Sequence, residues 1–90
     1  MLELILIQYF LPKLQKLDFS DNQLTSLPNN MTNLKELNCS RNQLRNLPNN
    51  MTQIQTLYCY TNQLTSLPNG MTNLKKLLCN NNQLTSLSIL

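Results

Sequence analysis

The sequence predicts a solenoid of the α/β type, with about four coils that each carry one short parallel β-strand on one side and extended or 3-10 backbone on the other. The first observation behind this prediction is a constant spacing of 20 residues along the column Asn22, Asn42, Asn62 and Asn82. The second is that apolar positions recur with the same spacing, as in the column Leu17, Leu37, Leu57 and Leu77. A fixed period in this range indicates stacked units that bury their apolar side chains only against one another.

The spacing of apolar residues within one unit predicts short strands. From Leu14 to Leu34 these residues are 3, 2, 5, 3, 4 and 3 positions apart, whereas a long helix holds a period of about 3.6 and a long strand a period of about 2. Only Leu17 and Phe19, with their equivalents, alternate as a strand does. We therefore expect strands centred on 16–18, 36–38, 56–58 and 76–78. Stacked about 4.8 Å apart, they would bury the leucine, methionine and cysteine columns.

Turn residues and a proline shape the rest of each unit. Asn and Asp in 21–23 favour a turn, because their side chains bond to nearby backbone groups. Pro28 fixes its own φ and forces Leu27 to be extended, which disfavours a regular helix through this point. We expect an extended or polyproline-II return with at most one helical turn, which would bring Leu27, Met31 and Leu34 to one face.

One unit carries a recognisable signature, which reads Leu34-x-x-Leu37-x-Cys39-x-x-Asn42-x-Leu44. It resembles the shortest class of leucine-rich repeats, known from secreted effectors of bacterial pathogens, and is similar to asparagine-rich repeats of giant viruses and some protists. The resemblance covers about 14–87. It implies a leucine-rich repeat right-handed superhelix that serves as a scaffold for binding, and says little about the target.

The two ends of the sequence depart from the repeat. Phe19 stands where later units have cysteine, and Ser88 stands where earlier units have proline. We expect 1–13 to be a degenerate partial repeat that caps the array of 14–90, because its apolar residues keep the register: Leu4, Ile7 and Leu11 precede Leu24, Leu27 and Met31 by 20 residues. After Leu87 comes no polar capping unit, so we expect end-to-end self-association or a place within a longer array.

The asparagine column is the first candidate for chemistry, and the resemblance gives it a structural role. In that role the amides of Asn22, Asn42, Asn62 and Asn82 bond to the backbone of their own turn and of the adjacent turn, which satisfies groups that a tight bend leaves unpaired.

The three cysteines, Cys39, Cys59 and Cys79, are expected to pack in the core. Zinc sites use closely spaced pairs and four ligands, whereas these thiols are 20 residues apart in a chain without histidine. An odd number of cysteines argues against a disulfide framework and for a reducing compartment. The N-terminal stretch lacks the basic region of a signal peptide. We expect a cytoplasmic or other reducing intracellular location, and the resemblance to effectors extends this to the cytoplasm of a host cell.

The residue inventory excludes most other functions. The sequence has no histidine, four carboxylates and the single glycine Gly70, so neither a catalytic site nor a glycine-rich phosphate loop is expected. We predict that the protein is not an enzyme and uses no cofactor or metal. The seven basic residues are scattered rather than clustered, which argues against nucleic acid. The apolar stretch at 1–11 is shorter than the roughly 20 residues of a membrane span.

The strand residues between the buried leucines are predicted to point to the concave face, because side chains alternate across a strand. Segments 21–40 and 61–80 agree at 15 of 20 positions, and four of the five differences lie on or beside this face. Such a pattern favours a binding surface that varies on a fixed scaffold, since tyrosine and arginine are typical of interfaces. The alternative is unconstrained drift at exposed positions. The candidate partner-binding residues are Arg41, Thr56, Tyr58, Tyr60, Lys76 and Leu78.

We therefore expect a protein–protein interaction module that binds a protein partner through the concave sheet face. The alternative is a structural or vestigial repeat fragment without a dedicated partner. Four strands span only about 15 Å, which is small against the roughly 800 Å² that each partner buries in a standard interface. We expect the array to bind weakly by itself or to be one piece of a longer array.

Overall fold

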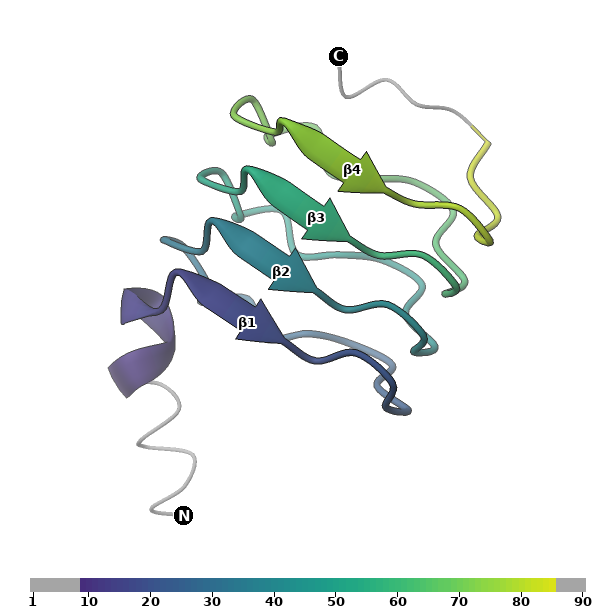
Figure 1. Cartoon of the computed structure of the whole chain (residues 1–90), viewed down its shortest axis with the longest axis horizontal. Helices are drawn as coiled ribbons and strands as arrows, with labels where there is room; N and C mark the ends of the chain where they lie inside the picture. Colours follow the sequence, from purple (N-terminus) through teal and green to yellow (C-terminus); the bar gives the residue numbers. More distant parts are fainter. Residues whose placement is uncertain (1–8, 86–90) are drawn as a thin grey trace.

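Four strands of three residues form one parallel sheet along one side of a stack of coils (Figure 1). The structure is a computed structural model and describes residues 9–85. Its elements are the 3-10 helix η1 (Leu11–Lys13) and the strands β1 (Lys16–Asp18), β2 (Glu36–Asn38), β3 (Thr56–Tyr58) and β4 (Lys76–Leu78). The strands lie at the predicted positions and in sequence order. We number the coils 1 to 4 by the strand that each contains.

The strands are paired without any shift between units. Leu17, Leu37, Leu57 and Leu77 are partners across the three pairs of strands. The backbone ladder continues beyond the strands, since Cys39 N donates to Tyr58 O at 2.8 Å and Arg41 N donates to Tyr60 O at 3.0 Å. The 20-residue spacing of the sequence therefore places each side chain directly beside its equivalent in the next coil.

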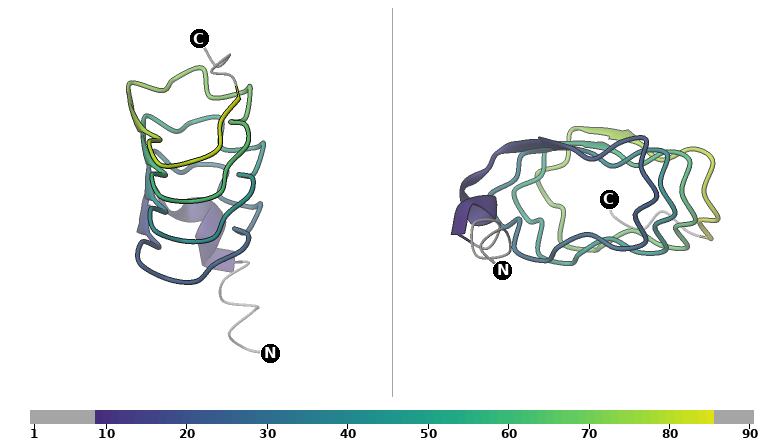
Figure 2. Two further views of the ribbon diagram at one scale, coloured as in Figure 1. Left: turned by 90° about the vertical axis from the view of Figure 1, so that its right-hand side faces the viewer. Right: turned by 90° about the horizontal axis from the view of Figure 1, so that it is seen from below.

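The core lies inside the coils, which Figure 2 shows stacked on one another with their strands on one side. Leu37, Leu57, Cys39 and Cys59 are all fully buried, as the repeat predicts. The outer coils differ: Leu17, Leu77 and Cys79 are half-buried. The expected burial of the whole Leu14 column is wrong at Leu14 itself, which is 37% exposed. Among residues 9–85 only coil 2 stacks on coil 1, so Leu14 has a neighbour on one side.

The return side of each coil contains turns rather than a regular helix. Buried methionines begin these turns, and a bond closes each: Leu34 N donates to Met31 O at 3.5 Å, Ile54 N to Met51 O at 3.5 Å and Leu74 N to Met71 O at 3.3 Å. Between residues 14 and 85 the structure has no helical segment. This agrees with the predicted extended path and its single turn.

Helix η1 precedes coil 1 and contributes to the core. Leu11 is buried. Asn33 Nδ2 donates to Pro12 O at 2.8 Å, much as Asn73 Nδ2 donates to Thr52 O at 3.4 Å later in the stack. The expected cap at 1–13 lies partly in 1–8, and the expected open C-terminus lies partly in 86–90. Both segments lie outside the described residues, so the division at residue 13 stays a prediction.

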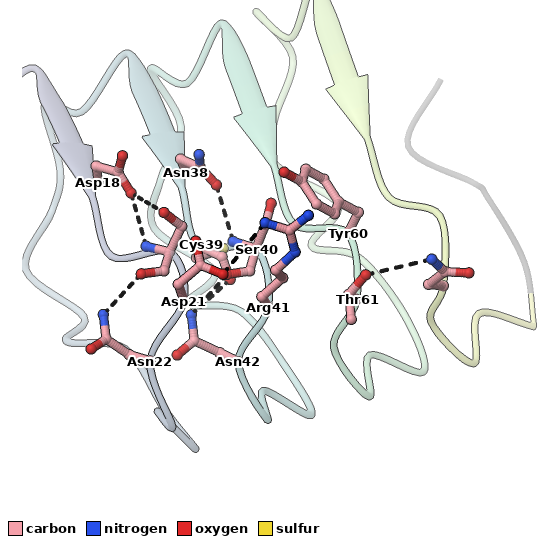
Figure 3. Close-up of polar contacts among 12 residues, drawn as sticks. Asp18, Asp21, Asn22, Asn38, Cys39, Ser40, Arg41, Asn42, Tyr60 and Thr61 are labelled. Atoms are coloured by element: carbon pink, nitrogen blue, oxygen red, sulfur yellow. Dashed lines mark hydrogen bonds and ion pairs between the residues drawn. The ribbon is translucent and has the colours of Figure 1, made fainter.

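Asparagine side chains join each coil to the one before it. Asn42 Nδ2 lies 3.0 Å from both Cys39 O in its own coil and Phe19 O in coil 1. Its Oδ1 accepts from Leu24 N, also in coil 1, at 2.9 Å. One amide thus donates and accepts across the same coil boundary, and Figure 3 shows it pointing toward the backbone at the strand ends.

The other asparagines of the column are placed alike. Asn62 donates to Cys59 O and Cys39 O, both at 3.1 Å, and accepts from Leu44 N at 3.0 Å. Asn82 makes the equivalent contacts between coils 4 and 3. Asn22 donates only within its own coil, to Phe19 O and Ser20 O. Asn62 is nearly buried, so its bonds are shielded from water.

We expect Asn62→Ala to lower the free energy of unfolding by at least about 2 kcal/mol. The change leaves several buried backbone groups unpaired, at roughly 1–3 kcal/mol each. Thr65→Ala, at an exposed position of the same coil, should change stability by less than about 0.5 kcal/mol. Asn22→Ala should fall between them, because Asn22 bridges no coil boundary within 9–85. Equal urea midpoints for the Asn62 and Thr65 variants would contradict the role of the column.

Candidate binding surface

The outward-pointing side chains of the four strands form one surface, which we call the sheet face. In each strand the middle leucine is the least exposed residue and the two flanking residues point outward. Two columns result: Lys16, Glu36, Thr56 and Lys76, and then Asp18, Asn38, Tyr58 and Leu78.

Two tyrosines of coil 3 lie on and beside the sheet face: Tyr58 is in β3, and Tyr60 follows two residues after that strand. Lys76 Nζ lies 5.4 Å from the centre of the Tyr58 ring, and the Arg41 guanidinium carbon lies 5.6 Å from the centre of the Tyr60 ring. Leu78 is the register partner of Tyr58 and is 42% exposed. These five residues form what we call the tyrosine patch. Each ring has a cation over it from a neighbouring coil, at a distance at which cation–π attraction acts.

Of the six predicted partner-binding residues, Thr56 is the one outside this patch. It is the register partner of Lys76 on the neighbouring strand and is half-buried. The structure therefore brings the other five into one patch and places Thr56 beside it. Their role in binding is a proposal, taken up below.

Charges are distributed unevenly along the stack. The carboxylates of coils 1 and 2 have cationic partners, with Lys16 Nζ 3.2 Å from Glu36 Oε2 and Arg41 Nη1 3.4 Å from Asp21 Oδ1. Both pairs are exposed, so each contributes only about 0–1 kcal/mol. No Asp or Glu follows Glu36 in the sequence, so Lys76 lies in a region without carboxylates of its own chain.

Ser20 organises the remaining carboxylate of the sheet face. The hydroxyl of Ser20 donates to Asp18 Oδ1, and its backbone N–H does so at 2.8 Å. These two bonds, the hydroxyl bond first, lower the pKa of Asp18 below its ordinary value. Asp18 therefore stays ionised at neutral pH and places a negative charge on the same strand as Lys16.

The third residue after each strand has left-handed backbone. Asp21, Arg41, Thr61 and Asn81 have φ angles of 57° or 58°. Asp and Asn tolerate this region, whereas Arg and β-branched Thr pay more for it. The turn reverses the chain and lets Arg41 reach the Tyr60 ring in the next coil (Figure 3). Residue type gave no signal for this conformation at Arg41 or Thr61, so sequence reasoning missed it.

Ser40 corrects an expectation about the sheet face. Ser40 holds the same repeat position as Tyr60, which was predicted to point to the concave face, yet Ser40 is fully buried and its Oγ has no hydrogen-bond partner. Its equivalent in the next coil is Tyr60, and the following residue is Arg41, whose guanidinium lies over the Tyr60 ring. We attribute the burial to these two large neighbours, which shield a small side chain between them.

Two open hollows lie away from the tyrosine patch. A polar hollow of about 490 Å³ is lined by Arg45, Asn46, Gln63, Thr65 and Gln83, with Arg45 as its single charged residue. An apolar hollow of about 430 Å³ lies on coil 1, and its lining includes Leu11, Leu17, Phe19, Leu24, Leu27 and Pro28. The second hollow lies on the outer side of coil 1, where Leu11 of η1 forms part of its wall.

The cysteine column carries free thiols. Burial raises the pKa of Cys39 to about 12. Burial, and after it the neighbouring thiols Cys39 and Cys79, also raises the pKa of Cys59. These two side chains therefore remain protonated at neutral pH and pack as small apolar groups. Within residues 9–85 no three His, Cys, Asp or Glu side chains are grouped to hold a metal ion.

The coil geometry agrees with a comparison to protein families. The family model described as "Leucine Rich repeats (2 copies)" matches this chain twice, at residues 12–50 and 32–70, and so covers more than half of it. The chain belongs to the leucine-rich repeat family. Leucine-rich repeats are generally protein-interaction modules and are typically non-enzymatic. A search of curated proteins returned no match. The described part of this leucine-rich repeat protein has no helix long and apolar enough to cross a membrane.

We expect Ser40→Ala to leave stability unchanged or to raise it by up to about 1 kcal/mol, because a buried hydroxyl without a partner has lost its hydration and gained no bond. Ser20→Ala is the matched control. It removes the bond to Asp18 and should destabilise slightly. The two variants are compared by thermal unfolding. A loss of more than about 1 kcal/mol in Ser40→Ala alone would contradict the unpaired hydroxyl.

Proposed function

We propose that this leucine-rich repeat protein binds a protein partner through the sheet face, with the tyrosine patch as the main contact. The observation that carries the proposal is the pairing of two tyrosine rings with Arg41 and Lys76 beside the exposed Leu78. Tyrosine and arginine are enriched among the residues that dominate binding energy. An exposed leucine next to them offers apolar area that a partner would remove from water.

The comparison of repeat copies supports the same face. Coil 2 and coil 4 carry different residues at the outward positions of their strands, Glu36 against Lys76 and Asn38 against Leu78. The inward residues Leu37 and Leu77 are identical. A contact surface is expected to show such sequence differences at outward-pointing positions and identity at the buried ones.

Charge indicates the chemistry of the partner. Lys76 has no carboxylate of its own chain beyond residue 36, whereas Lys16 and Arg41 lie beside Glu36 and Asp21. A partner segment that carries a carboxylate and an apolar side chain would complement Lys76 and Leu78 together. We propose such an acidic, partly apolar segment as the ligand of the tyrosine patch.

The three free thiols support a reducing compartment as the place of action, which we include in the proposal. The alternative function is a structural or vestigial fragment without a dedicated partner, and the experiment below separates the two.

We expect Tyr58→Ala/Tyr60→Ala to weaken partner binding by about 30-fold or more, since hot-spot truncations cost about 2 kcal/mol or more. The measurement is a proximity-labelling or pull-down survey with the wild-type chain, followed by titration of the purified partner with both proteins. Thr52→Ala/Thr72→Ala, at exposed positions outside the strands, is the matched control and should bind as the wild type does.

Folding of each variant is checked by circular dichroism before the titration. A partner that binds all three proteins equally would exclude the tyrosine patch as the contact. Failure to obtain any specific partner from several cell types would favour the fragment interpretation.

We further propose that the array associates end to end, with itself or with further repeats. The apolar hollow on coil 1 and the half-buried Leu74, Leu77 and Leu84 on coil 4 support this, because both surfaces are apolar and are formed by the same repeat. A contact between two different ends is heterologous, and it continues unless a rotation closes it.

We expect sedimentation velocity to show an average mass that rises with protein concentration. Leu24→Lys, which places a charge in the hollow on coil 1, should shift the chain toward monomer. Gln53→Lys, at an exposed position, adds the same charge away from the hollow and should not. A monomer at every concentration would contradict end-to-end association and leave the sheet-face proposal untouched.

A further inference from the structure

The turn at Asn69–Gly70 contains the one difference between copies 21–40 and 61–80 that lies away from the sheet face. The equivalent turns read Asn29-Asn30 and Asn49-Asn50, and Gly70 is the only glycine of the sequence. A unique glycine in an otherwise repeated turn calls for a physical explanation.

Backbone geometry does not explain this glycine. Gly70 does not have a positive φ, so the turn does not use the conformations that only glycine adopts freely. A Cβ added at Gly70 would lie 3.7 Å from Asn49 O and 3.7 Å from Thr52 Cγ2, which are ordinary contacts. The copies with Asn30 and Asn50 show that the repeat accepts a side chain here.

The absence of a side chain at Gly70 changes how easily the Gly70 backbone nitrogen can approach the side chain of Asn69. Asn69 is exposed and lies in a turn. The Gly70 N–H donates no hydrogen bond within residues 9–85, so the nitrogen is not held by the fold. Without a Cβ on Gly70, nothing on that residue blocks approach of its nitrogen to the Asn69 side-chain carbonyl carbon.

The glycine also removes a tie between coils. In coil 2, Asn50 Nδ2 donates to Asn29 O and fastens its turn to the turn before it. Gly70 has no amide with which to reach Asn49 O, although its position lies beside that oxygen. The Asn69–Gly70 turn therefore lacks the side-chain bond that fastens the Asn49–Asn50 turn to the coil before it.

We propose that Asn69 is a site of spontaneous deamidation. The Gly70 nitrogen loses its proton to solvent and attacks Asn69 Cγ, which forms a new C–N bond. The bond from Cγ to Nδ2 then breaks, Nδ2 takes up a proton, and ammonia leaves a five-membered succinimide. Water opens the ring at either carbonyl and gives aspartate or isoaspartate. One water is consumed and one ammonia released, without any redox change.

The products alter the molecule in two ways. Each carries one new carboxylate, which lowers the formal net charge of +3 by one and lies in a part of the sequence that has no Asp or Glu. The isoaspartate form also lengthens the main chain by one methylene within a turn that stacks on coil 2. Both changes lie on the return side of coil 3 and leave the tyrosine patch intact, so this proposal is independent of the proposed function.

The test is incubation of the folded chain at mildly alkaline pH and physiological temperature, followed by peptide mapping. We expect a mass increase of about 1 Da at Asn69, with a rate at least about tenfold above that at Asn49, a barrier difference of about 1.4 kcal/mol. Isoaspartate is detected by methyl transfer from labelled S-adenosylmethionine with an isoaspartyl methyltransferase.

Two variants serve as controls. Gly70→Asn restores the residue of the other copies, and Gly70→Ala adds only the Cβ; both should lower the rate at Asn69 to that at Asn49. The proposal is overturned if Asn69 in the folded wild type reacts no faster than Asn49. It is also overturned if Asn69 reacts only after unfolding in urea, because the coil would then protect it.

Discussion

The amide that bridges two coils is the interaction on which this fold depends. After each strand the chain turns inward, and the turn leaves carbonyl and N–H groups facing the interior. Asn42 satisfies a carbonyl in its own coil, a carbonyl in coil 1 and the N–H of Leu24 at once. Leucine columns supply most of the burial energy, but apolar contacts are not directional. The hydrogen bonds of the asparagine are directional, and they therefore set the rotation of one coil relative to the next.

A scaffold fixed in this way leaves the outward strand positions free for other uses. The side chains of Tyr58, Leu78 and Lys76 make none of the hydrogen bonds that join coils within residues 9–85, and their neighbours Leu57 and Leu77 do the packing. Because buried residues fix the backbone and outward residues do not, the two ends of the stack can differ in charge while their backbones stay alike. Asp18 and Asp21 stand beside lysines at the coil 1 end, whereas the coil 4 end carries lysine without any Asp or Glu.

The sequence predicts the features that arise within one repeat unit better than those that depend on the residues of a neighbouring coil. The positions of all four strands follow from the 20-residue period and the short Leu17–Phe19 alternation. Burial of Ser40 does not, because it depends on the size of Tyr60 in the next coil. Exposure of Leu14 depends on its place in the stack rather than on its type. The left-handed backbone of Arg41 has no local signal, since arginine disfavours it. The sequence predicts which side chains of the candidate surface point outward. It does not predict the contacts between tyrosine rings and cations, because these depend on side-chain rotamers that reach from one coil to the next.

Contacts between coils share one more property. Within residues 9–85 they join positions about one unit apart, such as Leu24 with Asn42, Asp21 with Arg41 and Phe19 with Asn42, at separations of 18, 20 and 23 residues. No hydrogen bond in this part of the chain passes over a coil. A gene that gains or loses one whole unit of coding sequence by unequal recombination would thus bring together coils that already fit each other. The number of coils can then change in a single genetic step. Each new copy can diverge at its outward residues while the hydrogen bonds between coils stay the same.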